Sequence, residues 1–192
     1  VYQGKTLIHL APKHNFVKQL MDQLFEWIKK TKVHPLIKSA AFHYEFEFIH
    51  PFNDKDVIFG QVTIALLIFE DINDFDYILC PIGGGGLISG VAVAAKELNP
   101  NIKVIGVQAE GAAAMAISYK QGKLIGIDAV NTIADGIAVK NPGKLNFEFI
   151  QKYVDDIITV SENDIVEAFL LLAEKQKLLA EPSGVVTLAA IK

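Results

Sequence analysis

The stretch Tyr77-Ile-Leu-Cys-Pro-Ile-Gly-Gly-Gly-Gly-Leu-Ile-Ser-Gly90 decides which fold the sequence predicts. Its first part, Tyr77 to Ile82, is a short apolar run typical of a buried strand. Four glycines, Gly83 to Gly86, separate this run from a small-residue helical pattern that begins at Leu87. Such a turn lets backbone N–H groups converge, and the helix start adds the positive end of its dipole. The stretch therefore predicts a site for a phosphate or a similar anion.

The composition excludes several classes of protein. The chain has 192 residues, 51% of them hydrophobic, and a net charge of −4, and all 18 cationic side chains are lysines. Without arginine or a basic patch, nucleic acid is not an expected partner. The apolar runs are too short to span a bilayer, and Val1 to Gly4 carries no charge typical of a signal peptide. We therefore expect no membrane and a cytoplasmic protein, in which the single cysteine, Cys80, is a buried core thiol.

Residue usage changes near position 52. All histidines fall within the first fifty residues, whereas thirteen of the fourteen glycines lie at Gly60 or later. This change predicts two segments, a helical one at 1–52 and an α/β one at 53–192.

The sequence does not indicate a metal site. His9 and His43 have no ligand spacing with any set of His, Cys, Asp or Glu residues, and Glu45 and Glu47 are interpreted as a solvated face.

The later segment alternates helices and strands. Lys103 to Val107 reads as a second strand after the glycine turn and its helix, giving a β-α-β unit with parallel strands. Together with the further elements, this predicts an α/β fold with a three-layer, open, mostly parallel sheet. The other expected elements are a helix at Asp54 to Glu70, a strand at Ile157 to Val160, a helix at Glu162 to Gln176 capped by Ser161, and a helix at Pro182 to Ile191.

Two nucleotide motifs fit the glycines poorly. A P-loop needs a lysine after its last glycine, but Leu87-Ile88 follows Gly86. A dinucleotide fingerprint comes closer with Gly84-x-Gly86-x-x-Ser89, although Gln108 ends the second strand where a ribose-binding acid is expected. NAD stays an alternative.

The segment from Phe48 to Lys192 resembles the threonine dehydratase family, pyridoxal-phosphate enzymes with the tryptophan synthase β fold. The resemblance rests on several motifs in family order: His50-Pro-Phe-Asn-Asp54 with Asp56-Val-Ile58 and Gly60-Gln61, Pro81 to Gly90, Thr132-Ile-Ala-Asp-Gly-Ile-Ala-Val139 and Ala180-Glu-Pro-Ser-Gly184. It implies that pyridoxal phosphate is the cofactor and that Gly83, Gly84, Gly85, Gly86 and Leu87 bind its phosphate. It also places Asp135-Gly136 and Glu181 near the cofactor ring and substrate. Read without the resemblance, Asp135 is a turn residue and Glu181 a helix-start carboxylate.

The activity implied by the resemblance is deamination of L-threonine or L-serine to a 2-oxo acid and ammonia. Family members supply a Schiff-base lysine from a Ser-x-Lys-x-Arg-Gly-like segment, and no such segment occurs here. Lys38-Ser39-Ala40 lacks the flanking pattern, so we do not assign Lys38 this role. We therefore expect the chain alone to be inactive as a lyase.

The first quarter resembles a different family, the Fic domains. The likeness is carried by Leu20 to Lys30, His34 to Ala40 and Phe42 to Phe52. It implies AMP transfer from ATP, with His50 as general base and Asp54 as magnesium ligand, but Lys55-Asp56-Val57 replaces the expected Gly-Asn-Gly-Arg. In the dehydratase interpretation His50 is structural.

Both resemblances meet at Phe48 to Asp54, so the hypothesis is a chimera. The alternatives are a Fic-type AMP transferase fragment and a noncatalytic product. An incomplete cofactor cleft leaves apolar faces uncovered, so we expect aggregation or a homo-oligomer.

Overall fold

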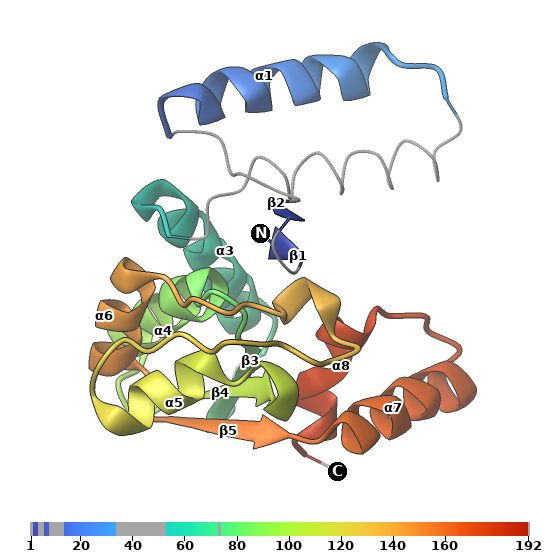
Figure 1. Ribbon diagram of the computed structural model, residues 1–192. Coiled ribbons are helices and arrows are strands. Elements are labelled where there is room, and N and C mark those ends of the chain that lie inside the picture. The colour runs from blue at the N-terminus through green and yellow to red at the C-terminus, as the bar shows by residue number, and fades with distance from the viewer. Residues whose placement is uncertain (1, 4–5, 8–13, 34–52, 73, 192) are drawn as a thin grey trace. The chain divides into compact units, whose positions relative to one another are not determined.

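The structure is a computed structural model that describes residues 2–3, 6–7, 14–33, 53–72 and 74–191. Contacts divide the chain into two compact units, Val1–Pro51 and Phe52–Lys192, which are described separately (Figure 1). In the first unit, strands β1 (Tyr2–Gln3) and β2 (Thr6–Leu7) pair antiparallel. Helix α1 (His14–Lys30) carries polar side chains on one side, where Lys18 and Asp22 form an ion pair one turn apart. No described helix is both long and apolar enough to cross a membrane.

The second unit begins with helix α3 (Lys55–Asp71), which confirms the helix predicted at 54–70 to within one residue. Asp54 is its N-cap, and the carboxylate accepts a hydrogen bond from the N–H of Asp56 at 2.9 Å. Only Ile58 and Ala65 are fully buried, although apolar residues occur around the whole circumference of the helix. Helix α3 therefore uses one side for packing within this unit.

A three-stranded parallel sheet forms the centre of the second unit. Strands β3 (Tyr77–Pro81), β4 (Lys103–Ala109) and β5 (Asp156–Val160) follow one another in that order across the sheet. Helix α4 (Gly86–Leu98) connects β3 to β4, so the predicted β-α-β unit is confirmed. Because the strands are parallel, their carboxyl ends all lie at one edge of the sheet.

Alternating residues of each strand contribute to different hydrophobic cores. On one face, β-strand residues such as Cys80 and Val104 pack with α4, α5 (Ala114–Gln121) and α6 (Lys144–Tyr153). On the other face, Val107 and Val160 pack with α7 (Glu162–Leu171) and α8 (Pro182–Ala189). Helices thus cover both faces, and the predicted three-layer α/β fold is confirmed (Figure 1).

The prediction of a helix at Glu162 to Gln176 is wrong over its last third. Helix α7 ends at Leu171, and Leu172–Gln176 forms a π-helical turn. There the N–H of Lys177 bonds to the carbonyl of Leu172, five residues back, and Lys177 has a φ of +56°. The turn reads Leu-Ala-Glu-Lys-Gln, all residues that favour an α-helix, so the local sequence does not indicate the wider winding. Helix α8 likewise ends at Ala189 rather than at Ile191.

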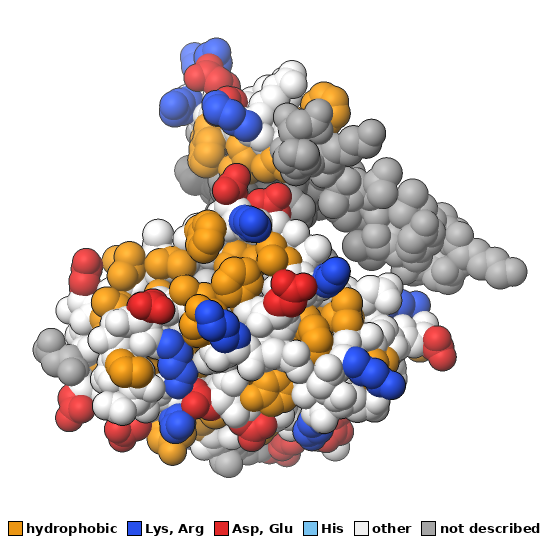
Figure 2. Space-filling view, turned by 90° about the vertical axis from the view of Figure 1, so that its left-hand side faces the viewer, with side chains coloured by type: hydrophobic (Ala, Val, Ile, Leu, Met, Phe, Trp, Pro, Cys, Tyr) orange, Lys and Arg blue, Asp and Glu red, His pale blue; other side chains and the backbone are white. Residues whose placement is uncertain are grey.

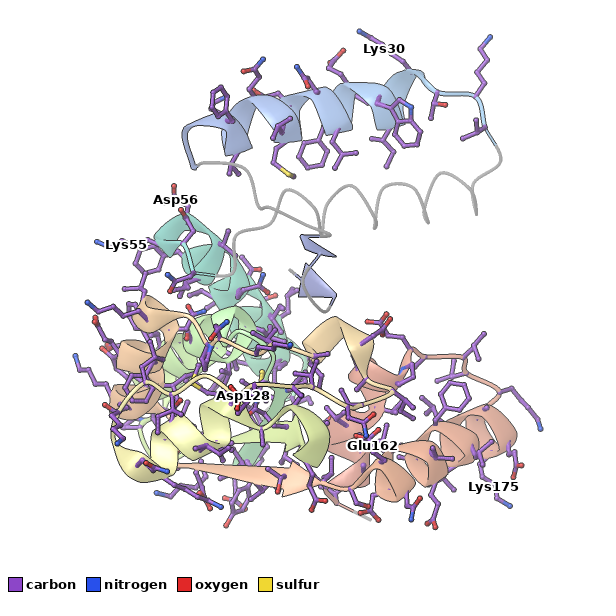
Figure 3. All side chains as sticks on the ribbon, in the orientation of Figure 1. Lys30, Lys55, Asp56, Asp128, Glu162 and Lys175 are labelled. Atoms are coloured by element: carbon purple, nitrogen blue, oxygen red, sulfur yellow. The ribbon has the colours of Figure 1, made fainter. Side chains whose placement is uncertain are left out.

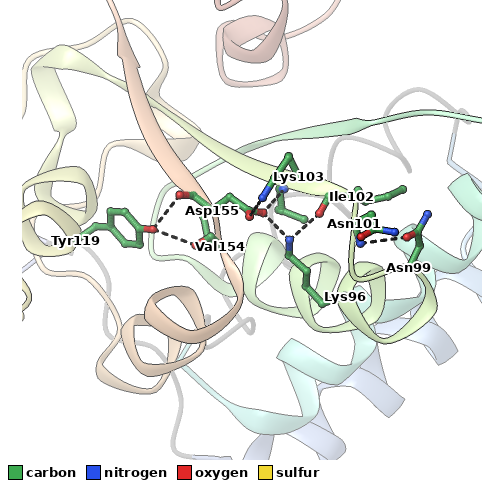
Figure 4. A network of polar contacts seen from close by, with 9 residues as sticks. Lys96, Asn99, Asn101, Ile102, Lys103, Tyr119, Val154 and Asp155 are labelled. Carbon is green, nitrogen blue, oxygen red and sulfur yellow. Dashed lines mark hydrogen bonds and ion pairs between the residues drawn. The ribbon is translucent and has the colours of Figure 1, made fainter.

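The amino ends of β4 and β5 are joined by a charged network (Figure 4). The Asp155 carboxylate contacts Lys96 Nζ at 2.6 Å and Lys103 Nζ at 3.0 Å, and it accepts a hydrogen bond from the Val104 N–H at 2.8 Å. Burial acts to raise the pKa of Asp155, but these three donors outweigh it and lower the pKa to about 2. The network lies at the edge of the sheet opposite to the glycine turn.

Candidate functional site

The glycine turn follows β3 directly and leads into α4. Gly85 is the N-cap of α4 and has a φ of +96°, in the left-handed region that favours glycine. Its carbonyl accepts hydrogen bonds from the Ser89 N–H at 3.1 Å and the Ser89 hydroxyl at 2.7 Å. A methyl group at Gly85 would lie 2.9 Å from both Ile150 Cδ1 and Met115 Cε. Backbone conformation and space therefore both require glycine here.

Backbone N–H groups at this turn have no acceptor in the described part of the chain. Gly84, Gly85 and Gly86 are buried, and neither their N–H groups nor that of Leu87 donates to any described residue. A buried N–H group without a partner is costly, and the start of a helix favours negative charge. These groups fit an anion with several acceptor oxygens, as a phosphate has.

Two residues at the start of α6, its N-cap Gly143 and Asn146, hold the turn in place. Asn146 Nδ2 donates to the Gly84 carbonyl at 2.7 Å, and the Gly143 N–H donates to the same oxygen at 3.2 Å. The neighbouring Leu145 N–H donates to Asn53 Oδ1 at 2.9 Å. The segment before α3, the start of α6 and the glycine turn are thereby linked.

The segment Thr132–Val139 packs against the first glycine. A methyl group at Gly83 would lie 3.1 Å from Ile137 Cα and 3.3 Å from Val139 Cγ2. The other end of this segment is tied to α7, because the Ile133 N–H donates to Glu162 Oε2 at 2.9 Å. Glu162 lies at the start of α7 (Figure 3). The segment therefore bridges the glycine turn and α7.

Gly136 of this segment faces the start of α8. A methyl group at Gly136 would lie 2.9 Å from Ser183 Oγ and 3.7 Å from Glu181 Oε1. Glu181 is the N-cap of α8, but its side chain makes no capping hydrogen bond. Ser183 is only 5% exposed, and its hydroxyl has no hydrogen-bond partner among the described residues. The structure thus places Gly136 next to Ser183 and Glu181, and it places Ile137, the residue after Gly136, against Gly83.

Some of the remaining predicted residues have structural roles, and others lie outside the residues that the structure describes. Asp135 starts a 3-10 turn (η2, Asp135–Ile137), and its carboxylate accepts from the N–H of Gly136 at 3.0 Å. Cys80 is buried, as predicted, and burial raises the pKa of its thiol to about 12. Several candidates lie outside the described residues: His9, Lys38, His43, Glu45, Glu47 and His50.

Gln108 has a role that the sequence did not predict. It does not end β4, which runs to Ala109, and its side chain is fully buried. Nε2 donates to the carbonyls of Ile82 and Ala112 at 3.1 and 3.2 Å, and Oε1 accepts from the Ala116 N–H at 2.8 Å. The amide ties the strand before the glycine turn to α5, so it is engaged within the protein core.

Fold and site together define a three-layer α/β protein with a glycine turn, suited to an anion, at the carboxyl end of a parallel strand. Residues 22–192 match the PALP family, described as pyridoxal-phosphate dependent enzymes. The chain belongs to this family, whose members depend on pyridoxal phosphate, and the NAD alternative is accordingly set aside. The buried N–H groups at the glycine turn fit the phosphate of that cofactor.

Similar proteins include lyases and a racemase. The L-threonine ammonia-lyase of Thermotoga maritima is 51% identical over 144 residues, which are 75% of this chain and 36% of that protein. The catabolic L-threonine dehydratase of Escherichia coli is 45% identical over 144 residues, 75% of this chain and 44% of that protein. The maize serine racemase structure aligns with a TM-score of 0.72 and 38% identity, covering 81% of this chain and 50% of that one. This chain therefore spans half or less of the length of these three proteins.

Proposed function

We propose that residues 53–192 form the phosphate-binding part of a pyridoxal-phosphate dependent lyase, with Gly83 to Leu87 as the phosphate site. The observation that carries this proposal is the set of buried N–H groups at Gly84 to Gly86, which have no acceptor among the described residues. When bound, pyridoxal phosphate withdraws electrons from the reacting amino acid. The glycine turn would hold the phosphate end and so fix where the ring lies.

The substrate class of the proposed lyase is a hydroxy amino acid, L-threonine or L-serine. The names of the relatives support this class, since they include threonine ammonia-lyase, threonine dehydratase and serine racemase. Within this chain, Glu181 and Ser183 lie close to Gly136, which belongs to the segment that packs on Gly83. We propose that Gly136 and Glu181 lie in the vicinity of cofactor and substrate.

The chain on its own does not complete the reaction in this proposal. It contains no Ser-x-Lys-x-Arg-Gly-like segment to supply the Schiff-base lysine. Incubation with pyridoxal phosphate and L-threonine should therefore give no 2-oxo acid, while equilibrium dialysis should show binding of pyridoxal phosphate that inorganic phosphate displaces. A borohydride-stable cofactor adduct at one lysine, accompanied by product, would contradict the inactivity. Absence of displaceable binding would contradict the phosphate site.

For residues 1–52 we propose a Fic-like origin, which makes the chain a chimera, and the match to the pyridoxal-phosphate family, which begins at residue 22, overlaps this segment. Its candidate general base, His50, lies outside the described residues, while Asp54 serves as the N-cap of α3. The capping bond gives Asp54 a structural role that needs no metal. Incorporation of labelled AMP that is lost in His50→Ala would favour AMP transfer over this proposal, and we expect no incorporation.

A further inference from the structure

Helix α6 receives its N-terminal cap from a residue outside the helix. Its N-cap is Gly143, which has no side chain to accept a hydrogen bond from the first turn. The N–H groups of a first turn have no acceptor within the helix and need one from elsewhere. Asn53 Oδ1 accepts a hydrogen bond from the Leu145 N–H at 2.9 Å, although Asn53 lies 92 positions earlier, just before α3. Asn53 therefore takes the role that an N-cap side chain usually has.

The space at the start of α6 is filled by two asparagine side chains. A methyl group at Gly143 would lie 2.7 Å from Asn53 Oδ1 and 2.6 Å from Asn146 Nδ2. Gly143 thus lies between two side-chain amides, and any larger residue would displace one or both of them. The glycine at this position is what allows Asn53 to reach the first turn of α6.

The first turn of α6 in turn fixes one peptide group of the glycine turn. The Gly143 N–H and Asn146 Nδ2 both donate to the carbonyl oxygen of Gly84, at 3.2 and 2.7 Å. Because a trans peptide group is planar, its carbonyl and its N–H point in opposite directions. A Gly84 carbonyl held toward α6 therefore directs the Gly85 N–H away from α6. The position of α6 thus sets the direction of one donor of the phosphate site.

Charged side chains do not replace this directional effect. The stretch from Gly83 to Gly90 contains no lysine, so an anion at the turn depends on the N–H groups and on the helix start. Figure 2 shows acidic and basic side chains interspersed on the side of the second unit where α3, α4 and α6 lie in Figure 1. The affinity for an anion should therefore be sensitive to the direction of each N–H group.

We propose that Asn53 is a positioning residue for the phosphate site. It holds the first turn of α6, which holds the Gly84 carbonyl and so directs the Gly85 N–H toward the phosphate. Asn53 acts through α6 and is not assigned a contact with the ligand. The proposal rests on the function proposed above, and it adds a residue from the segment before α3 to the support of that site.

The test is equilibrium dialysis of the full chain and its variants with pyridoxal phosphate. Asn53→Ala removes the acceptor, and we expect the affinity to fall about three- to tenfold, which corresponds to the loss of roughly one hydrogen bond. Asn53→Asp keeps an acceptor oxygen in the same place. At an ionic strength of about 0.3 M, which screens its added charge, this variant should bind within about twofold of the unchanged chain.

The matched control is Asn99→Ala, which removes the same kind of bond at the opposite end of α4. Asn99 is the C-cap of that helix, and its Oδ1 accepts from the Asn101 N–H at 3.1 Å (Figure 4). Asn99→Ala should leave the affinity unchanged. Circular dichroism shows whether each variant keeps its helix content. If Asn53→Ala unfolds the chain, Asn53→Leu takes its place with the same expected loss, because leucine is similar in size and has no acceptor.

NMR of the ligand-free chain separates the role of Asn53 from the identity of the ligand. Asn53→Ala should shift the Gly85 amide signal and accelerate hydrogen exchange at the Leu145 amide about three- to tenfold, and Asn99→Ala should do neither. If the unchanged chain binds no pyridoxal phosphate, the proposed phosphate site fails, while these two amides still decide whether Asn53 positions the turn.

Any one of four results would overturn the positioning role. They are a Gly85 amide signal that Asn53→Ala leaves in place, an affinity that Asn53→Ala leaves unchanged, an equal loss of affinity in Asn99→Ala, and an Asn53→Asp variant that binds as weakly as Asn53→Ala.

Discussion

Asn146 donates a hydrogen bond from Nδ2 to the carbonyl oxygen of Gly84 at 2.7 Å, although the two residues lie 62 positions apart in the sequence. Asn146 is fully buried at the start of α6, and Gly84 lies in the glycine turn. The carbonyl of Gly84 is thereby directed toward α6. The neighbouring N–H groups remain available for a ligand.

Replacing Asn146 should therefore weaken both the fold and the turn. Asn146→Ala removes the main donor to a buried carbonyl, which we expect to lower the free energy of unfolding by about 1–3 kcal/mol. Affinity for pyridoxal phosphate should fall as well, because the turn loses its anchor. Urea unfolding and equilibrium dialysis measure the two effects. Asn131→Ala, at an exposed asparagine, is the control, and equal behaviour of both variants would contradict the anchoring role.

Alanine at Gly85 should be far more harmful than alanine at Gly122, the other glycine of positive φ among the described residues. Both changes strain the backbone, at about 1–3 kcal/mol each. At Gly85 the added methyl group would also meet Ile150 and Met115 at 2.9 Å, whereas at Gly122 the nearest atom is 3.9 Å away. Overpacking should add about 1–3 kcal/mol to the loss at Gly85. Matching urea midpoints for the two variants would contradict this account.

Lowering the pH should remove the stabilisation that the Asp155 carboxylate gives to the folded state. Because its folded-state pKa of about 2 lies below the ordinary 3.8, this stabilisation is present above pH 3.8 and is lost as the pH falls toward 2. One pKa unit corresponds to about 1.4 kcal/mol, and partial exposure reduces the effect, so we expect a contribution on the order of 1–2 kcal/mol. Asp155→Asn should flatten the pH dependence of unfolding in this window. Asp128→Asn, at an exposed carboxylate, should leave it unchanged.

The thiol of Cys80 should be inert in the folded protein. Burial raises its pKa to about 12, so almost no thiolate exists at pH 8. Reaction with a thiol-specific disulfide reagent should proceed only after addition of denaturant. Rapid modification of the folded chain would show that β3 opens readily or that Cys80 is not in the core.

Local sequence patterns were sufficient to predict most of the framework. Apolar periodicity located α3 and the three strands, and the capping residue Ser161 marked the start of α7, because these signals depend on neighbouring residues. The glycine turn was recognisable for the same reason. The π-helical turn after α7 was missed, since Leu172–Gln176 consists of residues that favour an α-helix and carries no local signal of wider winding.

Contacts between distant segments could not be predicted from local patterns. Nothing near Asn146 indicates that its amide reaches Gly84, and nothing near Gln108 indicates that it joins β4 to α5. The same holds for Gly136, whose lack of a side chain is explained only by Ser183 across the contact. The family resemblance pointed to the segments around Gly83, Gly136 and Glu181, but only the structure shows the contacts that these segments make.

The central claim is that the N–H groups of Gly84 to Leu87 hold a phosphate group. The most direct measurement is an amide nitrogen–proton NMR titration of the labelled chain with pyridoxal phosphate, and with pyridoxal, which lacks the phosphate. We predict saturable shifts at Gly84, Gly85, Gly86 and Leu87 with pyridoxal phosphate, and none at these amides with pyridoxal. Equal shifts with both compounds, or shifts that leave these amides unaffected, would contradict the claim.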